Sequence, residues 1–178
     1  MEYKIVLDPG HGGRDIGAEG PCANEADVTL VLAHKLAQEL NQLGHKTKLT
    51  RTTDVYMGLT RRADIANNWN ADLFVSLHCN AAASTTAEGI EVFCFPDSVE
   101  GNLYAKAIQD GLTEAFPDHK DRGVKEANFA VLRKTNMAAV LVEAEFISNA
   151  NQCKFLTNEA NQDKIASTIA KAISGRLE

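Results

Sequence analysis

Three residues that could do metal or acid–base chemistry each stand at the end of a short apolar run, namely His11, His78 and Glu143. Short apolar runs bounded by turn residues are typical of buried strands. The carboxyl ends of neighbouring parallel strands share one edge of a sheet, and open α/β proteins bind their ligands there. We therefore expect the three side chains to lie close together at that edge.

Glu25 adds a second carboxylate to this set. It begins a helical pattern after the Gly-rich turn around His11, and the intervening loop can fold the start of that helix over the same sheet edge. Two histidines and one carboxylate are a common ligand set of catalytic zinc, which keeps its fourth position for water. We predict one Zn2+ ion bound by His11, Glu25 and His78. The alternative for Glu25 is a simple charge that the helix dipole favours in the first turn.

A zinc hydrolase also needs a group that moves protons, and Glu143 is predicted to be this catalytic residue. Its place in an apolar stretch should raise its pKa, so that it can accept a proton from water and pass it to a leaving amine. Glu145 has the same parity along an extended strand and competes for this role. The structural alternative for Glu143 is an ion pair with a nearby lysine or arginine.

The elements that must position these residues alternate between strands and helices. Strands are predicted at 5–7, 46–51, 72–77, 89–95 and 139–143, with a short extended piece at 129–133. Helices are predicted at 25–43, at 59–69, between 98 and 116, and near the end of the chain, where Ile165, Ile169 and Ile173 form one stripe. Residues 117–125 are predicted to be a polar loop. The alternation predicts a single α/β domain with a mostly parallel sheet.

The composition limits the partners that this chain can have. A net charge of -6 over 178 residues, without a clustered Lys/Arg run, argues against nucleic acid as a partner. No stretch approaches the ~20 apolar residues that membrane insertion requires. The N-terminus lacks the layout of a signal peptide, so we expect synthesis in the cytoplasm.

The cysteines and the remaining histidines are not predicted to form sites. Because no C-x-x-C pair is present, we expect free thiols rather than a disulfide framework at Cys22, Cys79, Cys94 and Cys153. We expect solvated side chains at His34, His45 and His119.

Several motifs together resemble one enzyme family over essentially the whole chain. They are V-L-D-P-G-H-G-G, Asn24-Glu25, R-R-A-D-I-A-N ahead of A-D-L-F-V-S-L-H-C-N-A, then D-R-G-V-K and V-L-V-E-A-E-F-I-S-N. Their order and spacing are similar to those of the zinc-dependent N-acetylmuramoyl-L-alanine amidases of bacterial and phage cell-wall type, the amidase 3 family. Two residues depart from the family pattern. Glu145 stands where the family usually has a small residue, and Ala138 stands where it usually has a proline.

The resemblance implies a fold and a reaction. The fold would be a six-stranded sheet flanked by helices, with residues 1–178 as the catalytic domain. The reaction would be hydrolysis of the amide between the lactyl group of N-acetylmuramic acid and the L-alanine of the peptidoglycan stem peptide. The zinc ligands of the family map onto His11, Glu25 and His78, and its catalytic glutamate maps onto Glu143. The partner would be peptidoglycan, bound by a monomer that acts on the cell wall after release, as autolysins and endolysins do, or that is an isolated catalytic domain.

Arg122 and Asn80 are predicted to bind the substrate. A guanidinium can hold a stem-peptide carboxylate through two hydrogen bonds. The alternative for Arg122 is a surface salt bridge with Asp118 or Asp121. Two other functions remain open at this stage, a peptidoglycan-binding module without catalysis and a zinc peptidase that cuts within the stem peptide. Zinc content distinguishes the binding module from an amidase, and product analysis distinguishes the peptidase from an amidase.

Overall fold

The computed structural model describes residues 1–177, which form six strands and six helices. The strands are β1 (Lys4–Pro9), β2 (Lys46–Leu49), β3 (Leu73–Asn80), β4 (Ile90–Cys94), β5 (Asp121–Glu126) and β6 (Ala138–Phe146). The helices are α1 (Glu25–Gln42), α2 (Leu59–Trp69), α3 (Val99–Ala115), α4 (Ala130–Arg133), α5 (Ala150–Thr157) and α6 (Glu159–Leu177).

The six strands make one sheet in the order β2-β1-β3-β6-β4-β5. Neighbouring strands are parallel except for β4 and β6, which are antiparallel. The predicted α/β domain with a mostly parallel six-stranded sheet flanked by helices is confirmed. Because β1, β3 and β6 are central neighbours and parallel, their carboxyl ends meet at one edge of the sheet, as the argument from strand ends required.

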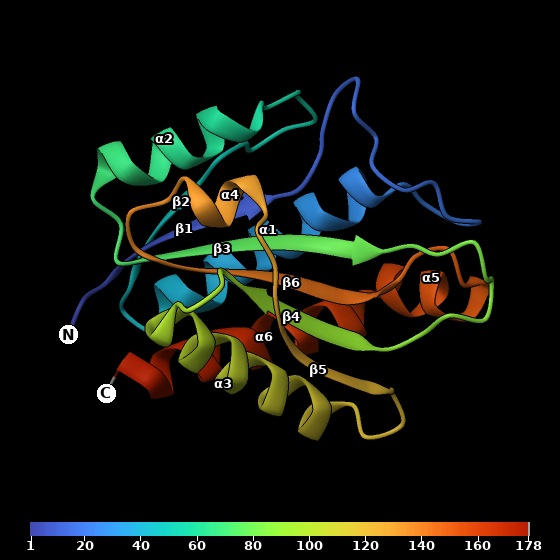
Figure 1. Ribbon diagram of the computed structural model, residues 1–178. Helices are drawn as coiled ribbons and strands as arrows, with labels where there is room; N and C mark the ends of the chain where they lie inside the picture. Colours follow the sequence, from blue (N-terminus) through green and yellow to red (C-terminus); the bar gives the residue numbers. More distant parts are fainter. Residues whose placement is uncertain (178) are drawn as a thin grey trace.

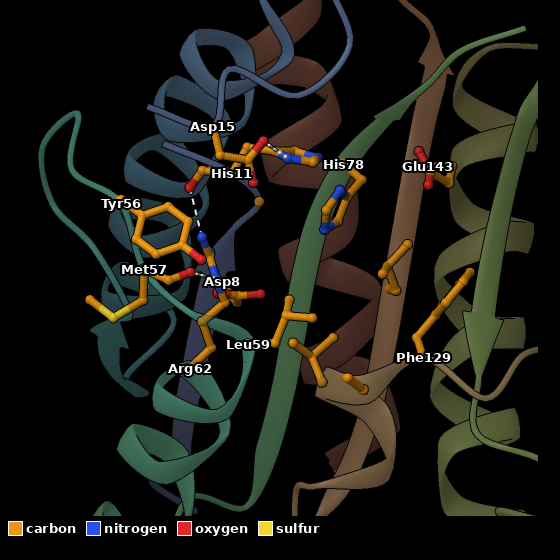
Figure 2. Close-up of a pocket in the computed structure, with 14 residues that line it drawn as sticks. Asp8, His11, Asp15, Tyr56, Met57, Leu59, Arg62, His78, Phe129 and Glu143 are labelled. Carbon is orange, nitrogen blue, oxygen red and sulfur yellow. Dashed lines mark hydrogen bonds and ion pairs between the residues drawn. The ribbon is translucent and has the colours of Figure 1, made fainter. Parts of the chain in front are cut away.

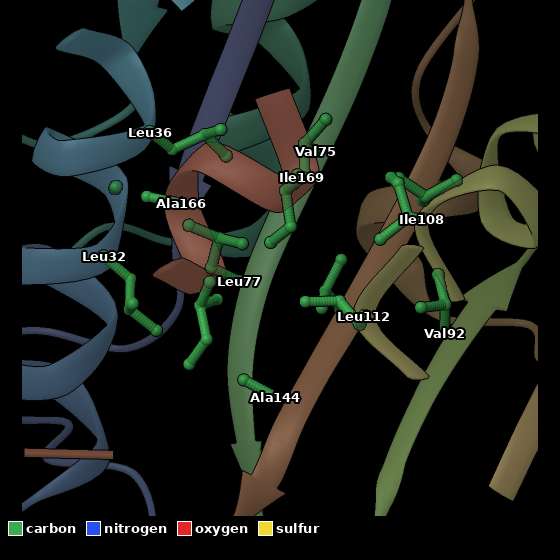
Figure 3. Close-up of a cluster of buried hydrophobic side chains, with 14 of the residues drawn as sticks. Leu32, Leu36, Val75, Leu77, Val92, Ile108, Leu112, Ala144, Ala166 and Ile169 are labelled. Atoms are coloured by element: carbon green, nitrogen blue, oxygen red, sulfur yellow. The ribbon is translucent and has the colours of Figure 1, made fainter. Parts of the chain in front are cut away.

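Helices cover both faces of the sheet (Figure 1). The larger core lies between the sheet and α1, α3 and α6, where side chains such as Leu36, Val75, Ile108 and Ile169 interdigitate (Figure 3). Each fully buried side chain of this size stabilises the fold by about 1.5–3 kcal/mol. A smaller cluster that includes Phe74 and Leu141 packs under α2 and α4 on the opposite face. Burial on both faces explains why the central strands appear in the sequence as continuous apolar runs.

Three local predictions were wrong or incomplete. Residues 121–126 form the edge strand β5 rather than a loop. An edge strand is only half covered, so its sequence D-R-G-V-K-E can be polar, and this polarity made the segment look like a loop. Residues 130–133 form the short helix α4 rather than an extended piece. One helical turn is too short to show a periodic pattern, so its apolar residues looked like a strand. Helix α5 had not been predicted.

The expectation of four free cysteines was wrong for one pair. Cys22 and Cys153 form a disulfide with a Cα–Cα distance of 6.0 Å, which links the loop before α1 to α5. Cys79 and Cys94 are free, as expected, and both are buried. The pair was missed because 131 positions separate its members, and only the fold brings them together.

Two of the three histidines expected to be solvated are instead buried or partly buried. His45 is buried, and its Nε2 lies 3.0 Å from Ser174 Oγ. His119 is partly buried and contacts Glu145. His34 is exposed on α1, as expected. In residues 1–177 no helix is both long enough and apolar enough to cross a bilayer.

Candidate metal centre

The three predicted metal ligands lie together at the carboxyl edge of the sheet. His11 follows β1, Glu25 begins α1 and His78 lies near the end of β3. One potential ligand atom from each falls within 4.8 Å of the others. His11 Nε2 lies 3.1 Å from Glu25 Oε2, and His78 Nδ1 lies 2.9 Å from Glu25 Oε1. The two imidazole rings meet edge to face with centroids 5.1 Å apart (Figure 2).

The carboxylate of Glu25 is fixed from several directions. Besides the two imidazoles, it accepts hydrogen bonds from the backbone N–H of Ala18 at 2.9 Å and of Cys79 at 3.0 Å. Burial acts to raise the pKa of Glu25, but the hydrogen bonds from His11 and His78 outweigh it and lower the pKa below its usual range. Glu25 is therefore ionised, and its hydrogen bond raises the pKa of His11 in turn, against the effect of burial.

Two glycines allow this close approach. A Cβ atom on Gly10 would lie 2.4 Å from the imidazole of His78. A Cβ atom on Gly17, whose φ is +68°, would lie 2.7 Å from both the Glu25 carboxylate and the His11 ring. The absence of a side chain at Gly10 thus makes room for the ring of His78, and its absence at Gly17 makes room for Glu25 and His11.

His11 itself has a left-handed backbone, with φ of 61°, which a non-glycine residue rarely adopts. Arg62 stabilises this conformation by donating to the carbonyl of His11 at 2.7 Å and to that of Pro9 at 2.6 Å. The guanidinium also forms a buried ion pair with Asp8 at 2.8 Å. A second buried arginine, Arg51, donates to the same carbonyl of Pro9 at 3.0 Å.

Asp8, Arg51 and Arg62 were not predicted to support the site. Asp8 and Arg62 stand within motifs that carry the family resemblance, and this was the available signal. Two buried arginines that hold one short turn indicate that the position of His11 is fixed before any ligand binds.

Glu143 lies on β6 directly beside His78 of β3 in the sheet register. Its Oε2 is buried and has no hydrogen-bond partner among the described residues. Burial raises the pKa of Glu143 to about 7, with Glu25 and Glu91 acting in the same direction and His78 against it. A buried carboxylate with an open oxygen and a pKa near neutrality is suited to accept and release a proton.

Glu145 points elsewhere because a β-bulge interrupts β6. His78 pairs with Glu143, but Asn80 pairs with Phe146, so β6 contains one extra residue over this interval. The carboxylate of Glu145 accepts hydrogen bonds from the N–H of Gly89 and of Phe146, both at 2.8 Å, and lies 2.9 Å from His119 Nδ1. Glu145 was expected to compete with Glu143 because the two share parity along the strand, but its carboxylate is held away from the ligand cluster.

A cavity of about 340 Å³ opens beside the ligand cluster. Its polar lining consists of Asp8, His11, Asp15, Arg62, His78 and Glu143. Its other walls are largely apolar and include Met57, Leu59 and Phe129, together with the ring of Tyr56 (Figure 2). The space is sufficient for part of a peptide or sugar chain next to Glu143.

The two predicted substrate-binding residues meet at a third residue that the sequence analysis missed. Asn80 Nδ2 donates to Glu91 at 2.6 Å, and Arg122 Nε donates to the same carboxylate at 2.9 Å. The alternative partners Asp118 and Asp121 do not pair with Arg122 among the contacts of residues 1–177. Glu91 occupies the position on β4 directly opposite Glu143.

The donor set fits a zinc ion. Two imidazole nitrogens and one carboxylate, close enough to share one cation, are the ligands that catalytic zinc commonly takes. The open oxygen of Glu143 beside them supplies a group that could bind a water molecule and move its proton. This arrangement is suited to hydrolysis of an acyl bond.

Comparison with known proteins gives consistent results. The family model described as N-acetylmuramoyl-L-alanine amidase (Amidase_3) matches residues 5–175. The sporulation-specific N-acetylmuramoyl-L-alanine amidase of Bacillus subtilis is 41% identical over 85% of this chain, and N-acetylmuramoyl-L-alanine amidase CwlM of Bacillus licheniformis is 38% identical over 92%. The crystal structure of an N-acetylmuramoyl-L-alanine amidase from Clostridium difficile 630 aligns with a TM-score of 0.94 at 36% identity, covering 99% of this chain and 97% of that one.

The similarity to the two Bacillus proteins covers only part of their length. The matched region accounts for 60% of the first and 64% of the second.

Proposed function

Because this chain belongs to the N-acetylmuramoyl-L-alanine amidase family, we propose that it cleaves the amide between the lactyl group of N-acetylmuramic acid and the L-alanine of the stem peptide. Residues 1–178 would form the catalytic domain, with one zinc ion as cofactor. The proposal rests on the buried Oε2 of Glu143, which has no hydrogen-bond partner in the described part of the chain and lies beside the cluster of His11, Glu25 and His78.

The three clustered residues would hold the zinc ion. In such a site zinc acts as a Lewis acid that polarises a carbonyl and makes water more acidic. The ionised Glu25 contributes the negative charge of the ligand set, and its backbone hydrogen bonds keep it oriented. Arg62 and Asp8 hold the turn that presents His11, so little reorganisation is needed when the site is filled.

Glu143 would transfer the proton that amide hydrolysis requires. The oxygen of water forms a bond to the lactyl carbonyl carbon while Glu143 takes a proton from that water. The C–N bond then breaks, and Glu143 gives the proton to the nitrogen of L-alanine, which leaves as an amine. A pKa of about 7 suits both steps, since the group must be basic in one and acidic in the other.

The partner in this proposal is peptidoglycan, with the protein acting on the cell wall as a monomer. The net charge of -6 does not favour nucleic acid as an alternative polymer. The largely apolar cavity beside Glu143 would receive the part of the substrate next to the scissile amide.

Mass spectrometry of digested peptidoglycan tests the proposal. The expected products carry a new amine on L-alanine and an intact lactyl carboxylate on the sugar. A chelator should remove the activity, and added zinc should restore it. Binding without any cleavage would support a peptidoglycan-binding module instead, and new termini within the stem peptide would support a peptidase. Either result would overturn the assignment.

A further inference from the structure

A second polar cluster lies beside the metal centre and is not needed to hold a metal. It consists of Glu91, Asn80, Arg122 and Lys125, and we call it the Glu91 cluster. Glu91 is buried, with 3% of its surface exposed, and accepts hydrogen bonds from the other three side chains. Burial acts to raise the pKa of Glu91, but the hydrogen bonds from Lys125 and Arg122 outweigh it and lower the pKa.

The sheet register places the Glu91 cluster on the same face as the catalytic candidate. Glu91 is the direct cross-strand partner of Glu143, and such pairs have Cα atoms about 5 Å apart. Asn80 shares a face with His78 because the two residues are two positions apart on β3. A substrate whose scissile amide lies at Glu143 therefore extends within reach of this cluster.

The cluster presents positive charge to solvent. Two cations share the single carboxylate of Glu91, in a chain whose net charge is -6. The side chain of Arg122 is 29% exposed and that of Lys125 is 39% exposed. The two cations and one carboxylate give the Glu91 cluster a net charge of +1, and the exposed parts of Arg122 and Lys125 present this charge to solvent.

The guanidinium of Arg122 is held in one orientation, but its Nη groups can still donate hydrogen bonds to a ligand. Its Nε donates to Glu91, and its central carbon lies over the ring of Phe146, 4.9 Å from the ring centroid. The only contact of its Nη groups among the described residues is a long one, from Nη1 to the carbonyl of Glu88 at 3.4 Å. These Nη donors are therefore available, and a fixed guanidinium edge is well suited to bind a carboxylate.

We propose that Arg122 and Lys125 form a carboxylate-binding site for the stem peptide, and that Glu91 and Asn80 are positioning residues for it. This inference rests on the proposed function, because it assumes that L-alanine lies at Glu143. The ligand is the free carboxylate of the residue that follows L-alanine in the stem peptide. The site would therefore distinguish stem peptides with this carboxylate free from those in which it is converted to a carboxamide.

Two matched substrates test the site. Both are muramoyl peptides that are identical except for a free carboxylate or a carboxamide on the residue after L-alanine. The wild-type protein should cleave the carboxylate form with a kcat/KM roughly 10- to 100-fold higher, mainly through KM, because a charge-assisted pair is lost in the amide. Lys125→Met and Arg122→Lys should each bring this ratio toward one. Lys106→Met, which removes an exposed lysine paired with Asp110 on α3, should leave the ratio unchanged.

Glu91→Gln tests the positioning role. It keeps the size of the side chain but weakens its hold on both cations, so the ratio should fall although neither cation has been removed. Zinc content and the melting temperature of each variant show whether the protein is folded and loaded. If the variants lower cleavage of both substrates equally, or if the wild-type protein shows no preference, the carboxylate site is overturned.

Calorimetry separates failure of this site from failure of the proposed function. If the wild-type protein cleaves neither substrate, the proposed function fails, but the free stem peptide and its amide can still be titrated into the zinc-loaded protein. Tighter binding of the carboxylate form that is lost in Lys125→Met would support the site without any cleavage. Equal binding of both forms to the wild-type protein would overturn it.

Discussion

Glu143 and Glu145 stand two residues apart on β6, yet their surroundings are opposite. Glu143 faces the metal centre, and its Oε2 has no partner among residues 1–177. Glu145 is completely buried behind the site and is bound by two backbone N–H groups and His119. Burial alone therefore does not distinguish the two carboxylates. They differ in the number of donors around them, which leaves an oxygen of Glu143 open to a water molecule and occupies those of Glu145.

A β-bulge is the cause of this difference. One extra residue in β6 turns Glu145 away from the face that Glu143 and His78 share. The bulge thus lets one short strand carry both the proposed proton-transfer group and a buried carboxylate that is held by two backbone N–H groups and His119. Substitutions in the two regions should accordingly affect different properties, activity in the first and stability in the second.

The largest effect should follow from removing His78, the proposed zinc ligand that lies beside Glu143 in the sheet. We expect His78→Ala to lower zinc affinity by more than the roughly 10- to 100-fold that loss of an outer-sphere partner costs, because a direct ligand is removed. Peptidoglycan cleavage should fall to background. Bound zinc, measured after gel filtration, and muropeptide release check this result. His34→Ala, at an exposed histidine on α1, is the control. Full zinc occupancy in His78→Ala would show that the cluster is not the metal centre.

The second largest effect should follow from Glu143→Gln. It keeps the size of the side chain but removes its basicity, so kcat should drop by roughly 100- to 10,000-fold, as for loss of a general acid–base group. Zinc content should not change, because Glu143 is not one of the three clustered ligands. Zinc analysis and muropeptide cleavage measured on the same preparation check both statements. If Glu143→Gln remained active, a residue other than Glu143 would have to move the proton.

The sequence predicted the parts of this molecule that depend on short-range patterns. Strands buried on both faces and amphipathic helices produce clear runs and periods, and this is why the alternation and the sheet type were right. The meeting of His11 and His78 followed from one further rule, that parallel strand ends meet at one edge, and Glu25 was added because the loop after His11 can fold the start of α1 over that edge.

The remaining features depend on how distant segments align. The bulge that separates Glu143 from Glu145 exists only in the pairing of β3 with β6. The contact of Arg62 with His11 spans 51 positions, and the Glu91 pair with Arg122 spans 31. No local pattern encodes such contacts, so buried charged residues were the hardest part of the site to predict.

Glu145→Gln should affect stability rather than chemistry. The variant disturbs the hydrogen bond between residue 145 and the partly buried His119, and we expect a loss of about 1–3 kcal/mol in the free energy of unfolding. Urea unfolding checks this value. A double-mutant cycle with His119→Gln isolates the contribution of the pair. If Glu145→Gln were stable, zinc-loaded and inactive, the roles assigned to the two glutamates would have to be exchanged.

The smallest predicted effect is a pH-dependent difference in stability that belongs to Glu143 alone. Burial raises its pKa from 4.5 to about 7 in the metal-free protein. A carboxylate with a raised pKa in the folded state contributes stability that is present below pH 4.5 and is lost as the pH rises through 7. The wild-type protein should therefore lose roughly 2 kcal/mol between pH 5 and pH 8 from this group, whereas Glu143→Gln should not.

Urea unfolding of both proteins in a chelator, at pH 5 and at pH 8, measures this difference. The other ionisable groups are shared, so the contributions of those distant from Glu143 cancel when the two proteins are compared, and the difference reports Glu143 together with its neighbours His78, Glu25, Glu91 and His11. Glu114→Gln, at an exposed position on α3, is the matched control and should follow the wild-type protein at both pH values. If Glu143→Gln also followed the wild-type protein, Glu143 would have to be solvated or paired. The contrast with Glu145 would then rest on orientation alone.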